Sequence, residues 1–162
     1  MIVSIGASLL FAPILVALLA CVYQAAPSTQ KIWGLLGLAC ALLYAALVSI
    51  VYVTWLFVLE PQLLSGNTAK VQPFLFEKGS FLMMLDGLGY TYSCLAALCV
   101  APLFTGKGLA RWIRWLAIGN GVVALPVFLS YVLGNIALGI WWQLTLPTFT
   151  LLLALLFRRK DG

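Results

Sequence analysis

The residue whose type and position most clearly suggest chemistry in this chain is Asp86. It lies inside a long apolar run that begins near Phe76, whereas nearly all other charged residues lie between apolar runs or close to the C-terminus. A carboxylate about two turns into a membrane-spanning helix is costly to place there, so such a residue is a candidate for a functional role. The sequence therefore indicates a site at Asp86, but it does not indicate an activity.

Four further residues are expected to lie near Asp86. Tyr90 and Ser93 follow it at spacings of four and three, which place the three side chains on one face of an α-helix. Tyr52 and Gln143 fall at a similar depth, roughly 10 Å from the outer ends of their own apolar runs at the usual helical rise. These positions predict an outward-facing polar pocket with Asp86 at its floor.

Three roles remain open for this pocket. In the first, Asp86 is a structural tie that is hydrogen bonded to Gln143, to Tyr52 or to a broken stretch of backbone. In the second, it binds the polar end of a ligand. In the third, it carries a proton or takes part in catalysis, as intramembrane carboxylates do in pumps and transporters.

Asn120 is a second polar point, deeper in the fourth apolar run and flanked by Gly119 and Gly121. An asparagine at such a depth can bond to another helix, which contributes about 1 kcal/mol or less. The two glycines favour close helix packing as its main use. Asn120 is nevertheless retained among the candidate ligand-binding residues.

Composition indicates a membrane protein. Apolar residues make up 64% of the chain and charged residues 8%, whereas an ordinary globular domain has about 25% charged residues. A net charge of +5 would suggest a nucleic-acid partner in a soluble protein. Here the basic residues flank apolar runs, which favours a role in orienting the chain in a bilayer. We therefore expect no nucleic-acid partner.

The residue inventory argues against a metal or a cofactor. The chain has no histidine, which removes the usual haem ligand and the commonest zinc ligand. None of its four cysteines forms a Cys-x-x-Cys pair, and we expect all of them to behave as small buried hydrophobes. No nucleophile–base pair or phosphate-binding loop is visible. We therefore assign no catalytic residue, no metal and no cofactor, and an enzyme is the least favoured class.

The apolar runs predict an all-α fold, a single transmembrane domain of five spans. Each run is long enough to cross a hydrocarbon core of about 30 Å, and residues 60–78 form the one substantial loop, on the outer side. Seven basic residues fall on one side of this arrangement and two on the other. That bias predicts an outside N-terminus and a cytoplasmic C-terminus in the inner membrane of a bacterium. The expected spans are 2–24, 32–59, 79–104, 111–133 and 137–157.

Two local patterns refine this arrangement. Gly34, Gly37 and Ala41 recur at spacings of three and four in the second run, which predicts close contact with neighbouring helices. Trp141 and Trp142 lie near the start of the last run and are expected to anchor it at the membrane interface.

Parts of the chain resemble bacterial multi-pass membrane proteins of the DUF4386-like kind. The stretches that carry this resemblance are Arg111–Leu116, Asn120 with Gly121, Pro126, Trp141, Pro147, Leu156–Arg159 and Leu85–Tyr90. The resemblance implies a multi-pass membrane fold and brings no activity with it. In size, span number and tryptophan content the chain is also similar to the tryptophan-rich sensory proteins, which bind porphyrin and sterol-like ligands. That likeness is one of shape alone.

The sequence favours a non-enzymatic membrane module that binds a lipophilic small molecule, a membrane lipid or a partner helix. Tyr90, Tyr52 and Gln143 would orient the polar end of the ligand near Asp86. The alternative is a small proton-coupled transporter in which Asp86 exchanges a proton. A homodimer or another membrane-protein partner stays open, because the small-residue faces permit either.

Overall fold

The computed structural model describes residues 2–160, without the side chains of residues 2–5, 7, 70, 136, 159 and 160. The chain is 86% helical and the described residues contain no strand, which confirms the all-α class. The helices are α1 (Ile2–Ala25), α2 (Lys31–Thr54), α3 (Glu60–Leu64), α4 (Thr68–Val71), α5 (Phe81–Val100), α6 (Leu109–Leu133) and α7 (Trp142–Lys160). A π-helical turn, Trp55–Leu59, joins α2 to α3. Short 3-10 turns are Ser28–Gln30, Gln72–Phe74, Ala101–Leu103 and Ile136–Leu138.

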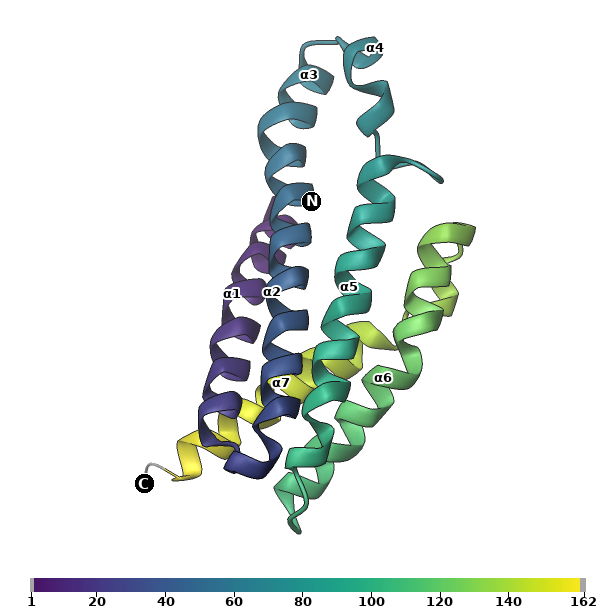
Figure 1. Cartoon of the computed structure of the whole chain (residues 1–162). Helices are drawn as coiled ribbons and strands as arrows, with labels where there is room; N and C mark the ends of the chain where they lie inside the picture. Colours follow the sequence, from purple (N-terminus) through teal and green to yellow (C-terminus); the bar gives the residue numbers. More distant parts are fainter. Residues whose placement is uncertain (1, 161–162) are drawn as a thin grey trace.

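Four long helices form the body of the molecule, and α7 crosses them. Helices α1, α2, α5 and α6 lie side by side in that order, while α7 runs obliquely behind them (Figure 1). Helix α7 packs against α6, α5 and α1. Large buried side chains from this interior are Leu15, Leu19, Tyr44, Val48, Ile113, Leu146, Phe149 and Leu153.

Four helical segments are long and apolar enough to cross a membrane. They are Ser8–Ala25, Ser28–Leu64, Phe81–Leu103 and Leu109–Leu133, and a shorter apolar helix covers Trp142–Arg158. The chain therefore has four to five apolar helices that could span a bilayer, which is compatible with a multi-pass membrane protein. The count of five spans and the orientation in the membrane stay predictions.

The second apolar helix is longer than the sequence predicts. It continues past Leu59 to Leu64, so the helical path Ser28–Leu64 covers 37 residues, or about 55 Å at the helical rise. Pro61 lacks an N–H and its ring crowds the carbonyl of Phe57. The π-helical turn directly before it widens the helix at this point, which lets the helix continue. The predicted outer loop therefore begins with helix α3 and also contains α4.

The break between the last two helices falls where the sequence predicts it. Gly134 ends α6 in the left-handed conformation with a φ of 67°, which favours glycine. Helix α7 begins only at Trp142, five residues after the predicted start of the last span at residue 137. Its first residue, Trp142, lies against Tyr90 of α5.

Glycines set the closest contacts between helices. A Cβ atom on Gly37 would lie 2.5 Å from Cγ1 of Val100 and 3.1 Å from the carbonyl oxygen of Ala96, both on the α5 side. A Cβ atom on Gly34 would lie 2.8 Å from the Cα atom of Tyr23 in α1. These contacts confirm the close packing that the small residues of the second run predict.

We expect Gly37→Ala to lower the thermal unfolding midpoint of the detergent-solubilised protein. The added methyl group would force α2 and α5 apart, and overpacking of this kind costs about 1–3 kcal/mol. Gly119→Ala is the matched control, because a Cβ atom there meets no atom within 4 Å. Equal midpoints for the two variants would contradict the close α2–α5 contact.

Candidate functional site

Asp86 is buried in the interior of the helix bundle. It lies in the second turn of α5, whose first residues are capped by Ser80, since the Oγ atom of Ser80 accepts a hydrogen bond from the Met83 N–H at 3.2 Å. Asp86 is 3% exposed. Its Oδ2 atom accepts a hydrogen bond of 2.9 Å from the hydroxyl of Tyr131 on α6. Its Oδ1 atom is buried and has no hydrogen-bond partner among the described residues.

Gly87 allows Tyr131 to reach Asp86. A Cβ atom at position 87 would lie 2.6 Å from Cγ of Tyr131, so only glycine leaves room for this ring between α5 and α6. Tyr131 itself lies two residues before the end of α6 at Leu133. The Asp86–Tyr131 pair is therefore close to the end of the bundle at which α6 stops.

Aromatic side chains from four helices gather next to this pair. The hydroxyl groups of Tyr52 on α2 and Tyr90 on α5 are hydrogen bonded at 2.7 Å. The Tyr90 ring lies 4.2 Å from the Trp142 ring of α7, measured between centroids, and 6.4 Å from the Tyr131 ring of α6. Tyr44 of α2 lies 5.8 Å from Tyr90 on another side. Tyr90 is thus the centre of an aromatic cluster one helical turn from Asp86.

Two cavities border the aromatic cluster, and Trp142 contributes to the wall of both. The first, of about 270 Å³, is lined by Phe76, Met83, Ser130, Tyr131, Gly139, Trp142 and Gln143. The second, of about 210 Å³, is lined by Ser8, Phe11, Tyr44, Tyr90, Trp142, Leu146 and Pro147. Asp86 does not line the first cavity itself. It is joined to that cavity through Tyr131, its hydrogen-bond partner, and through Met83, one turn earlier on α5.

The segment before α5 lies across the first cavity. Phe76 lines the cavity and also meets the Trp55 ring edge-on, with centroids 5.7 Å apart. The side chain of Lys78 reaches Gly134 at the end of α6, because a Cβ atom on Gly134 would lie 3.2 Å from Cδ of Lys78. The chain between Phe76 and Lys78 therefore bridges from the α2 side of the bundle to α6.

Three of the residues that the sequence singles out lie at the site, namely Tyr90, Tyr52 and Gln143, whereas Ser93 and Asn120 have other contacts. Tyr90 and Tyr52 bond to each other beside Asp86, and Gln143 is an exposed residue in the wall of the first cavity. Ser93 is fully buried, but its hydroxyl donates to the Tyr90 carbonyl at 2.7 Å within the same helix. Ser93 therefore supports α5 locally and presents no free group to the cavities.

Asn120 lies apart from this site. Its Nδ2 group donates to the carbonyl of Leu116 at 2.8 Å, and its Oδ1 atom accepts from the hydroxyl of Thr145 on α7 at 2.9 Å. It is about 16 Å along α6 from Tyr131 at the helical rise. Asn120 thus bonds to another helix, as its surroundings in the sequence predict, and both of its polar atoms have partners.

Sequence reasoning missed three members of the cluster: Tyr44, Tyr131 and Trp142. Trp142, expected as an interfacial anchor, instead packs against Tyr90 because α7 starts late and crosses the bundle obliquely. Depth gives no signal for Tyr131. It lies two residues, or about 3 Å, from the outer end of its predicted span 111–133, whereas Asp86 lies seven residues, or roughly 10 Å, into its own.

The described residues hold no group of three or more histidine, cysteine, aspartate or glutamate side chains that could bind a metal ion. Cys94 is buried, Cys40 and Cys99 are half-buried, and Cys21 is exposed, all as free thiols. The expectation of buried cysteines is thus wrong for Cys21. Because α1 is apolar on its outer face as well, an exposed thiol there faces the same surroundings as its leucine neighbours.

Fold and site together define a class of protein: an all-helical chain whose apolar helices suggest a membrane-embedded protein, with a buried carboxyl group beside an aromatic-walled cavity. No known protein family, curated protein or solved structure matches the chain. The resemblance to DUF4386-like proteins therefore stays a prediction.

We expect Tyr131→Phe to lower the thermal unfolding midpoint. The substitution removes the one hydrogen bond that Asp86 accepts from the side chains that the structure describes, and the loss of a partner by a buried carboxyl group costs about 1–3 kcal/mol. Tyr92→Phe is the matched control, since Tyr92 is a half-buried tyrosine of the same bundle for which no side-chain hydrogen bond is found. If both variants unfold at the wild-type temperature, the Asp86–Tyr131 bond does not contribute to stability.

Proposed function

We propose that the chain is a non-enzymatic membrane protein that binds the polar end of a lipophilic ligand in the cavity beside Asp86. One observation carries this proposal: the Oδ1 atom of Asp86 is buried, accepts no hydrogen bond from the described residues, and belongs to a carboxyl group tied to the wall of that cavity. A buried polar atom without a partner costs about 1–3 kcal/mol. Natural proteins tolerate such a cost mainly where function requires it.

The walls of the cavity suit a ligand with an apolar body. Ligand sites are mostly apolar and aromatic, with a few polar groups that fix the orientation of the ligand. Phe76, Trp142 and Met83 provide the apolar surface, and Tyr131 and Gln143 provide polar groups. The ligand would pack its apolar part on the rings and direct a hydrogen-bond donor towards the Asp86–Tyr131 pair.

The arrangement in the membrane is part of the proposal. We infer five spans, with α7 as the fifth, an outside N-terminus and a cytoplasmic C-terminus in a bacterial inner membrane. The support is the charge distribution: the described basic residues at the end where α1 joins α2 and α5 joins α6 are Lys31, Lys107, Arg111, Arg114 and Arg158. An excess of lysine and arginine is typical of cytoplasmic loops. The cavity beside Asp86 would then lie towards the outer face.

The rival function is a proton-coupled carrier in which Asp86 exchanges a proton. The sequence supports this function through the carboxylate of Asp86 inside an apolar run. The hydroxyl groups of Tyr131, Tyr52 and Tyr90 add polar atoms near that carboxylate. Binding is the simpler use of this geometry, because it requires only the cavity and the unpaired oxygen. Uptake into vesicles that is driven by a pH gradient and lost in Asp86→Asn would favour the carrier.

Native mass spectrometry of the protein, extracted in a mild detergent, tests the proposal. We expect wild type to carry a small molecule that is lost from Asp86→Asn, because an amide cannot replace the carboxyl group as an acceptor on both oxygens. Thr91→Val is the matched control on the same helix, since the Thr91 hydroxyl bonds only to the Gly87 carbonyl, at 2.8 Å. A wild type without any bound molecule, or a molecule equally retained by Asp86→Asn, would contradict the proposal.

A further inference from the structure

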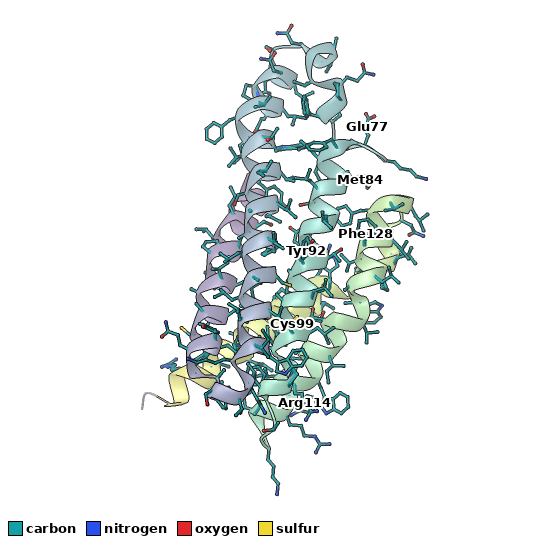
Figure 2. All side chains as sticks on the ribbon, viewed as in Figure 1. Glu77, Met84, Tyr92, Cys99, Arg114 and Phe128 are labelled. Atoms are coloured by element: carbon teal, nitrogen blue, oxygen red, sulfur yellow. The ribbon has the colours of Figure 1, made fainter. Side chains whose placement is uncertain are left out.

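One end of the bundle carries positive charge that no described acidic residue balances. The basic residues there are all exposed, and they are Lys31, Lys107, Arg111, Arg114 and Arg158. The described acidic residues are Glu60, Glu77 and Asp86, and none of them lies at this end. Figure 2 shows Arg114 and Glu77 at opposite ends of the molecule. The described part of the chain therefore leaves this end with a net positive charge.

The start of α6 concentrates two of these cations next to two indole rings. Arg111 and Arg114 are three residues apart and so share one face of the helix, and Trp112 and Trp115 share the adjacent face. The two tryptophans are 68% and 58% exposed. A hollow of about 560 Å³, here called the α6 hollow, is lined by Gly108, Arg111, Trp112 and Trp115.

The chemistry of the α6 hollow fits a phosphate group attached to an apolar body. A guanidinium group pairs with phosphate through two parallel hydrogen bonds, and arginine is favoured wherever such recognition is needed. An indole ring has an apolar body and a single N–H donor, which suits the boundary between headgroups and acyl chains. A free phosphate ion would use the arginine but not the exposed rings.

We propose that the α6 hollow binds the headgroup of an anionic phospholipid, with Arg111 on its phosphate and Trp112 and Trp115 against the start of its acyl chains. The preference for an anionic over a zwitterionic lipid follows from the charges. No described carboxylate lies at this end to pair with a choline or ethanolamine ammonium, whereas uncompensated cations attract net negative charge. The site shares no residue with the cavity beside Asp86, so it does not depend on the proposed function.

Lipid titration of the delipidated full-length protein, followed by native mass spectrometry, tests this proposal. The probes are phosphatidylglycerol and phosphatidylcholine with identical acyl chains. We expect wild type to bind phosphatidylglycerol about fivefold more tightly than phosphatidylcholine, and Arg111→Gln to lose most of that preference. Arg111 is exposed, so the thermal unfolding midpoint of this variant should stay at the wild-type value.

The control removes the same charge from the same end of the molecule but outside the α6 hollow. Arg114→Gln should keep the preference for phosphatidylglycerol, because Arg114 does not line the hollow. An equal loss of preference in Arg111→Gln and Arg114→Gln would mean a diffuse attraction of charges and would overturn the site. An unchanged preference in Arg111→Gln would overturn it as well.

Discussion

The candidate site depends on the hydrogen bond between Asp86 and Tyr131. This bond joins α5 to α6 at a point where Gly87 lets the tyrosine ring lie directly against the backbone. It satisfies one oxygen of a buried carboxyl group and leaves the other without a partner. A site of this kind is more costly than an apolar contact of the same shape, so its presence calls for a functional reason.

The cavity results from the way in which α7 meets the other helices. Helix α7 begins late and crosses obliquely, so its first residue, Trp142, packs on Tyr90 inside the bundle. Gly139 fits tightly beneath this turn, since a Cβ atom there would lie 2.8 Å from Oγ of Ser130. Space remains between the start of α7, the end of α6 and the segment that contains Phe76. The polar end of a ligand would thus be held by α5 and α6, and its apolar body by α7.

The sequence predicts the helical class, the break at Gly134 and the neighbourhood of Asp86, Tyr90 and Tyr52, because these follow from apolar run lengths, glycine and depth. It does not predict Tyr131 as the partner of Asp86. That pairing depends on which helix packs against Gly87, and periodicity within one helix carries no such information. The position of Trp142 was missed for a related reason, since the tilt of α7 is set by packing against α6, α5 and α1. Likewise, the π-helical turn before Pro61 extends the second helix beyond its predicted end.

The central claim is that Asp86 is kept for binding rather than for stability. Thermal unfolding of ligand-free wild type and of Asp86→Leu/Tyr131→Phe, in the same detergent, tests it most directly. Replacing both partners of a buried hydrogen bond with apolar groups of similar shape is often neutral or stabilising. We expect the double variant to be within about 1 kcal/mol of wild type, or more stable. A loss of about 2 kcal/mol or more would show that the pair holds the bundle together and would contradict the account.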